Sequence, residues 1–337
     1  MAGTTHVWLL SLGAPPAPEG AAAWVAALWA DADAVTPTVP WLRRLLAWLA
    51  ARWSAPALAR RCEGIDADTL RWAEVERQAR DLGRVLGAHY AVRPVMRYAG
   101  PSAAQAAKDL RKGDRVILLP VEAQVSGPTT ISPTRHALAA LAGLPVSVAQ
   151  VQGYPDLPAY VEAVAETLRE ALVDLPAGSG DYQVLFCARG LPGRPGAYPD
   201  QLLATARAVV ALCRLGRPWH LAYTATPGLG RPMRPLATDQ AAALGKLGAR
   251  CLVLVPLGLS SEHVETRVEL DQEVAAAARA AGVLHVQRAP TVATRPTFVR
   301  ALAELVRQAE DRAGWDVPWR TQAANSRDQP PTSGPTG

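Results

Sequence analysis

The chain is most constrained by the stretch 250–274, RCLVLVPLGLSSEHVETRVELDQEV, in which an aliphatic run leads into a polar segment. The run 251–255 predicts a fully buried β-strand, and the proline and glycine that follow it end the strand. Ser260 and Ser261 are then candidate N-caps of a helix. A buried strand that passes directly into a polar helix is typical of an α/β fold.

Three glutamates on the predicted helix, Glu265, Glu269 and Glu273, are spaced four residues apart. They would form one acidic stripe, with His263 in the first turn. Such a stripe is often only a solvated helix face, and acids near a helix N-terminus also favour the helix dipole. The strand before the helix supports a functional interpretation, because open α/β sheets bind ligands beyond the carboxyl ends of their strands.

Strand-like runs and amphipathic helices alternate through the rest of the chain. Further buried strands are predicted at 6–12, 114–120 and 182–187. The alternation restarts after Gly153, which predicts two similarly built α/β halves. We place the two domains at 1–153 and 154–312, followed by a polar, disordered tail at 313–337.

The composition argues against several classes of function. The net charge is +5, but the arginines are scattered, so nucleic-acid binding has little support. The cysteines stand far apart, which favours a reducing cytoplasm over a disulfide framework; they are Cys62, Cys187, Cys213 and Cys251. The N-terminus lacks the basic segment of a signal peptide, and no apolar run reaches the ~18 residues of a membrane span. We expect a cytoplasmic protein that binds no nucleic acid.

The polar segment also carries a family resemblance. SSEHVETRVELDQEV, at 260–274, is similar at nearly every position to the S-D-H-I-E-T-L-x-E-L-D-x-E signature of ferrochelatases, which insert ferrous iron into a porphyrin. The resemblance extends over residues 6–310 and includes LLSLGAP at 9–15 and GLP at 190–192. It implies an α/β fold of two similar Rossmann-like domains with parallel sheets and a cleft between them. It also implies that Glu265 lies in this cleft.

One position departs from the family pattern. The resemblance places the catalytic histidine of the family at Arg189, in LFCARGLPG. A guanidinium stays protonated and can only donate hydrogen bonds. It would also repel an incoming cation by about 4 kcal/mol per unit charge at a distance of ~4 Å and a dielectric constant of ~20. Glu122 stands where the family has a tyrosine, so we expect Glu122 to pair with Arg189 and offset its charge.

Metal insertion requires ligands that release the ion again and bases that accept two pyrrole protons. The predicted catalytic residues are Glu265, which accepts a proton, His263 and Arg189. The predicted metal ligands are Glu265, Glu269, Glu273 and Glu122.

Two further segments resemble family motifs and predict contacts with the porphyrin. They are MRY at 96–98 and QVSGPTT at 124–130. The predicted binding residues are Arg97, Tyr98, Gln124, Ser126 and Thr129. For Arg97 an ordinary surface ion pair fits equally well.

The segment that follows residue 36 crowds tryptophans among leucines and arginines on an amphipathic helix; they are Trp41, Trp48 and Trp53. Packing in the core is one interpretation. Trp with Arg is also typical of interfaces, and the resemblance places this segment at the lip of the cleft. We therefore expect an exposed lip that can touch the porphyrin or a membrane surface.

Three functions are compatible with these residues. The chain could be a working ferrochelatase, a degenerate chelatase that binds porphyrin or heme without inserting metal, or a chelatase for another metal or tetrapyrrole. We expect the first, as a monomer or weak dimer with porphyrin and Fe²⁺ as substrates. We expect no cofactor and no iron–sulfur cluster, because the last thirty residues contain no cysteine.

Overall fold

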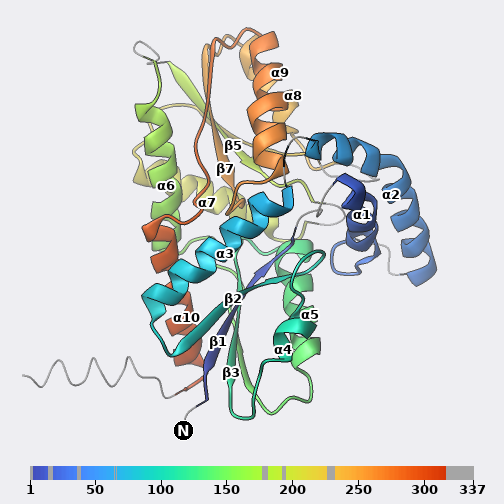
Figure 1. Cartoon of the computed structure of the whole chain (residues 1–337). Coiled ribbons are helices and arrows are strands. Elements are labelled where there is room, and N and C mark those ends of the chain that lie inside the picture. Colours follow the sequence, from blue (N-terminus) through green and yellow to red (C-terminus); the bar gives the residue numbers. More distant parts are fainter. Residues whose placement is uncertain are drawn as a thin grey trace, which may run out of the picture.

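The structure is a computed structural model of the chain (Figure 1). It describes residues 3–13, 18–35, 39–63, 65, 67–176, 181–191, 195–225 and 232–315, with 67–72 described by their backbone.

Two parallel four-stranded sheets organise the described residues (Figure 1). The first has the order β2-β1-β3-β4 and consists of β1 (Thr5–Ser11), β2 (Tyr90–Met96), β3 (Arg115–Pro120) and β4 (Ser147–Gln150). The second has the order β6-β5-β7-β8 and consists of β5 (Tyr182–Ala188), β6 (Trp219–Tyr223), β7 (Cys251–Leu257) and β8 (His285–Arg288). The identical order confirms the prediction of two similarly built α/β halves.

The central strands are buried from end to end. Every residue of β1 and of β7 is buried, and β5 is buried over its last five residues. Strands covered by helices on both faces of a parallel sheet read as continuous aliphatic runs instead of alternating ones. This pattern made the strands predictable from the sequence.

Helices connect the strands and cover both sheets. They are α1 (Ala21–Ala30), α2 (Pro40–Cys62), α3 (Ala67–Leu86), α4 (Ala103–Ala107), α5 (Ser132–Leu141), α6 (Pro158–Val173), α7 (Tyr198–Leu212), α8 (Ala237–Lys246), α9 (Ala275–Ala280) and α10 (Pro296–Arg312). Shorter or wider turns are η1 (Pro18–Gly20), a 3₁₀ turn, and the π-helical segments η2 (Gly127–Ile131) and η3 (Glu265–Val274).

Two helices cross from one half of the molecule to the other. α6 follows the last strand of the first sheet but packs against α7 and β7 of the second half. α10 follows the last strand of the second sheet but returns to pack against α3, β3 and β4 (Figure 1). The Tyr90 hydroxyl at the start of β2 donates to the buried Glu310 of α10 at 2.9 Å. The domain boundaries at 153 and 312 stay a prediction.

α1 and α2 pack against each other and project from the side of the molecule (Figure 1). A small core of Leu12, Trp24, Leu28 and Trp29 holds them to the first half. The outer tryptophans of α2 are exposed: Trp41 by 67%, Trp48 by 62% and Trp53 by 65%. The prediction that these tryptophans are exposed is therefore confirmed, and contact of this segment with a porphyrin or a membrane stays a prediction.

Among the described residues, no helix combines the length and the apolar character that a membrane span requires. Of the tail predicted at 313–337, residues from 316 onward lie outside the described residues.

Candidate active site

The candidate site lies where the two central strands of the second sheet end. Ala188 at the end of β5 pairs with Leu257 at the end of β7, so Arg189 and Gly258 begin neighbouring loops. From β5 the chain continues to β6 at one edge of the sheet, and from β7 it continues to β8 at the opposite edge. Such a switch point at the carboxyl ends of parallel strands is where open α/β folds bind ligands.

The first half of the molecule reaches this point through the loop after β3. Gly258 has φ +66°, and a Cβ atom on it would lie 2.9 Å from Oε1 of Gln124 and 3.5 Å from the Tyr198 hydroxyl. Nε2 of Gln124 donates to Oγ1 of Thr205 at 2.9 Å. Gly258 therefore allows the two halves to approach closely.

The segment after Gly258 differs from the predicted capped α-helix. The helix begins at Glu265 and is π-helical up to Val274, so His263 precedes it. Ser260 and Ser261 are buried, and within the described residues their hydroxyls have no hydrogen-bond partner. The prediction that they cap the helix is wrong, because the helix begins at Glu265 and its N-cap position is Val264. π-helical turns are rare and frequently occur at functional sites.

His263, Glu265 and Arg189 form one contact cluster. An ion pair joins Nη1 of Arg189 to Oε1 of Glu265, and Nη2 of Arg189 lies 3.2 Å from Nε2 of His263. Nδ1 of His263 contacts Oε2 of Glu265. His263 and Arg189 are buried, while the Glu265 side chain is 22% exposed. The structure thus brings together the three residues predicted to be catalytic.

Both ring nitrogens of His263 face N–H groups. Nη2 of Arg189, a guanidinium nitrogen that can only donate, lies 3.2 Å from Nε2. The backbone N–H of Glu265 donates to Nδ1 at 3.1 Å, and Oε2 of Glu265 contacts the same nitrogen. In this arrangement Arg189 covers Nε2, so this nitrogen is not open to a proton or a metal ion.

Glu269 lies one turn further along the helix and is only 3% exposed. Its carboxylate accepts a hydrogen bond from the backbone N–H of Ala225, and Oε2 lies 3.7 Å from Nη1 of Arg61. Burial raises the pKa of Glu269 to about 7, against the hydrogen bond and the charge of Arg61. A carboxyl group with this pKa can take up and release protons near neutral pH.

Glu273 is the third member of the acidic row, the glutamates Glu265, Glu269 and Glu273 of η3. Nε and Nη2 of Arg61 donate to its two carboxylate oxygens at 2.8 and 2.5 Å. The described residues hold no group of three or more His, Cys, Asp and Glu side chains arranged to hold a metal ion. The roles of Glu265, Glu269, Glu273 and Glu122 as metal ligands stay a prediction.

Glu122, in the loop after β3, is buried. Burial raises the pKa of Tyr198, the charge of Arg189 lowers it, and the charge of Glu122 raises it. The Tyr198 hydroxyl donates to the backbone oxygen of Arg189 at 3.3 Å. The charges of Arg189 and Glu122 therefore both affect the pKa of Tyr198. An ion pair between Glu122 and Arg189 stays a prediction.

The residues predicted to contact the porphyrin lie in two places. Ser126 and Thr129 form the N-cap of η2, since Oγ of Ser126 accepts from the backbone N–H of Thr129 at 3.2 Å. Gln124 contacts Thr205 of the second half. Pro192 of the GLP motif lies outside the described residues. Porphyrin binding by these residues stays a prediction.

Arg97 and Tyr98 surround a buried carboxylate that the sequence did not single out. Nη2 of Arg97 and the Tyr98 hydroxyl donate to Oδ2 of Asp31 at 2.6 and 2.8 Å. Burial raises the pKa of Asp31, but hydrogen bonds, the first from Ser132, and the charge of Arg97 outweigh it and lower the pKa. The ion pair expected for Arg97 is present, but it is buried at the base of the lip.

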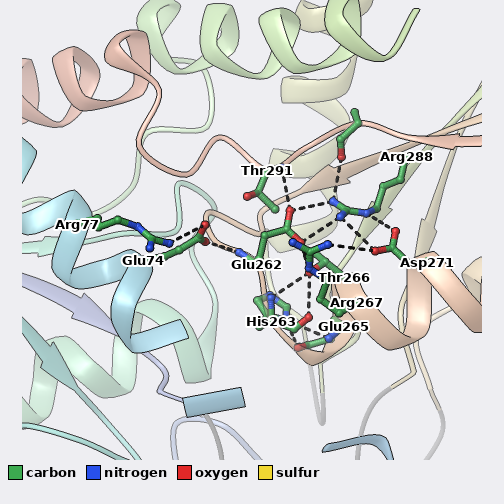
Figure 2. A network of polar contacts seen from close by, with 11 residues as sticks. Glu74, Arg77, Glu262, His263, Glu265, Thr266, Arg267, Asp271, Arg288 and Thr291 are labelled. Atoms are coloured by element: carbon green, nitrogen blue, oxygen red, sulfur yellow. Dashed lines mark hydrogen bonds and ion pairs between the residues drawn. The ribbon is translucent and has the colours of Figure 1, made fainter. Parts of the chain in front are cut away.

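A second network missed by sequence reasoning fixes the loop before His263 (Figure 2). The carboxylate of Glu262 accepts hydrogen bonds from Nη1 of Arg288 at 2.9 Å and from Oγ1 of Thr266 at 2.8 Å. Its backbone N–H donates to Glu74 of α3 at 2.5 Å. Nε2 of Gln78, also on α3, donates to the backbone oxygen of Ser260 at 2.9 Å. α3 of the first half therefore holds the loop that positions His263.

The fold and the site together define an α/β protein of two similar halves, with His, Glu and Arg side chains gathered at the switch point of the second sheet, a chelatase-like architecture. SirB from Bacillus subtilis, solved with Fe³⁺, has a similar fold, with a TM-score of 0.56 and 11% identity over 92% of this chain and 98% of that one.

Sequence comparison narrows this class. A family model of ferrochelatases matches residues 4–310. A ferrochelatase of Geobacter metallireducens is 31% identical over 92% of this chain and 99% of its own length, and one of Geotalea uraniireducens is 29% identical over 90% and 97%. The chain belongs to the ferrochelatase family, the lyases that insert ferrous iron into a porphyrin in heme biosynthesis.

Proposed function

We propose that the chain inserts ferrous iron into a porphyrin with Glu265 as the first proton acceptor. The reaction replaces two pyrrole protons by one Fe²⁺, so a base must face the ring and two protons must leave. The arrangement that supports this role is the Glu265 carboxylate, partly exposed beside buried His263 and Arg189. Glu269, with its pKa raised by burial to about 7, accepts protons that pass along the row.

By the sequence resemblance, Arg189 corresponds to the catalytic histidine of the family, and we assign it a different role. It holds the Glu265 carboxylate and the His263 ring in place. Its charge would repel Fe²⁺ by about 8 kcal/mol at ~4 Å with a dielectric constant of ~20. The ion pair with Glu265 offsets most of this repulsion, so a cation can approach the site.

The lip formed by α1 and α2 borders a membrane in this proposal. Residues 40–62 contain arginines and no acidic residue, and the exposed tryptophans lie on the same helix. Exposed Trp next to Arg is typical of a helix that lies on an anionic lipid surface. The protein is otherwise cytoplasmic and works without a resident cofactor or iron–sulfur cluster.

Anaerobic addition of Fe²⁺ to the purified protein and a porphyrin tests the proposed reaction. We expect the absorbance spectrum of heme to develop at a rate that Glu265→Gln lowers about 100-fold or more, the range for loss of a general base. The porphyrin difference spectrum should survive in this variant. Porphyrin binding without heme formation in the parent would indicate a lapsed enzyme, and turnover with cobalt or nickel alone would indicate a chelatase for another metal.

A further inference from the structure

The last turn of the lip helix α2 is tied to the acidic row. Arg61 donates two hydrogen bonds to the Glu273 carboxylate, at 2.8 and 2.5 Å, and lies 3.7 Å from Glu269. The next residue, Cys62, packs against Val264 and Val268. Two contacts of different chemistry therefore hold the end of α2, an ion pair to carboxylates and an apolar packing contact.

Charges of both signs alternate along the row. Arg189 pairs with Glu265 at the inner end, and Arg61 pairs with Glu273 at the outer end. Glu269 lies between them, and its pKa responds to the charges of Arg61, Glu273 and Arg189. Both ends of the row are thus neutralised by guanidinium groups.

The outer end is the more accessible of the two. The side chains of Glu273 and Arg61 are 34% and 31% exposed, against 22% for Glu265 at the inner end and 4% for Glu269 between them. A divalent cation that arrives at the outer end therefore meets the Arg61–Glu273 pair before it meets Glu269. The cation and the guanidinium compete for the same carboxylate oxygens, because both bind them directly.

We propose that Arg61 is a latch on cation entry: a divalent cation engages Glu273 and Glu269 only when Arg61 leaves them, and this loosens the end of α2 from the acidic helix. The inference rests on the proposed function, because it assigns the row to the iron substrate. Arg61 is a positioning residue in this scheme. Coupling between two binding events is reciprocal, so a looser lip helix also strengthens cation binding at the row.

Cobalt(II) binding without porphyrin tests the latch, measured by calorimetry under anaerobic conditions. Arg61→Ala should bind cobalt about tenfold more tightly than the parent. Arg60→Ala is the matched control, because it removes the same charge from the adjacent, exposed position of α2 and should change the affinity less than twofold. Arg61→Lys, which keeps the charge but loses the two-pronged geometry, should fall between them.

The double variant Arg61→Ala, Glu273→Gln locates the gain in affinity. It should lose the tighter binding, because the carboxylate that Arg61 releases is gone. Equal cobalt affinity of Arg61→Ala and Arg60→Ala would overturn the proposal, and so would a double variant that still binds tightly.

Hydrogen–deuterium exchange of peptides covering residues 43–62 tests the link to the lip. Exchange should quicken in Arg61→Ala, and addition of cobalt to the parent should have the same effect. Unchanged exchange in both cases would refute the coupling. Neither measurement involves turnover, so a parent that forms no heme would contradict the proposed function while the latch is judged separately.

Discussion

Nη2 of Arg189 lies 3.2 Å from Nε2 of His263, so the arginine donates to the nitrogen that a catalytic histidine would use as a base. The sequence resemblance predicts a histidine of the family at the position of Arg189. Arg189 is not itself a base, but it contacts both the carboxylate of Glu265 and the ring of His263. In our proposal it positions these two groups, and carboxylates accept the protons.

The first prediction concerns the stability that this cluster provides. Arg189→Leu should lower the free energy of unfolding by about 2 kcal/mol, less than the ~3–5 kcal/mol for a fully buried pair, because Glu265 is partly exposed. Urea unfolding at pH 7 measures the change. The control is Arg217→Leu, which breaks an exposed ion pair with Asp181 and should cost less than about 1 kcal/mol. Equal losses in the two variants would contradict a structural role for Arg189.

The second prediction follows from the raised pKa of Glu269. The folded protein holds this proton up to about pH 7, whereas the unfolded chain releases it near pH 4.5, so stability falls as the pH rises between these values. Glu269→Gln keeps a neutral side chain at every pH, so the variant does not lose this stability as the pH rises. Its stability relative to the parent should therefore increase by up to about 3 kcal/mol from pH 4 to pH 8.

Thermal unfolding of parent and variant across this pH range measures the difference. The variant at pH 4 is its own control, since both proteins carry a neutral side chain at this position there. A stability difference that does not change with pH would show that Glu269 titrates normally.

The third prediction concerns Gln78. Gln78→Leu removes the two hydrogen bonds that its amide donates to the backbone oxygens of Ser260 and Ala293, at a cost of about 0.5–1.5 kcal/mol each. Because the same loop carries His263, kcat for iron insertion should also fall, while KM for the porphyrin changes little. Gln308→Leu on the exposed face of α10 is the control. A variant with normal kcat would show that α3 does not position the loop.

The fourth prediction concerns the lip. Replacing both Trp48 and Trp53 by Ala should reduce cosedimentation with anionic lipid vesicles about tenfold or more, because both indoles are exposed. Leu247→Ala provides the comparison, since this leucine is 82% exposed but lies in the second half, away from the lip. Higher salt should weaken binding of the parent by screening the arginines. Unchanged sedimentation of the double variant would exclude a membrane role of the lip.

The sheets and the location of the site were predictable from the sequence for a physical reason. A strand buried on both faces needs an aliphatic run, and β7 has one at 251–255, although the strand continues through Pro256 to Leu257. Its last residue lies at the sheet edge where parallel folds bind ligands, so Glu265 and His263 were expected there. The exposure of Trp48 could not be predicted from the amphipathic pattern of its helix, because that pattern does not show which face another element covers.

Other features could not be predicted because they depend on contacts between distant parts of the chain. Arg61 and Glu273 are 212 residues apart, and Gln78 and Ser260 are 182 apart. The π-helical form of η3 was missed because glutamates at every fourth position suit an ordinary α-helix as well.

Because α10 returns to pack against the first sheet, the first half is synthesised before the second half but is completed only after it. β1 to β4 leave the ribosome early, yet the helix that covers β3 and β4 lies at 296–312, after the whole second half has been made. The nascent amino-terminal half therefore exposes the apolar surface under α10 until residues 296–312 have been made.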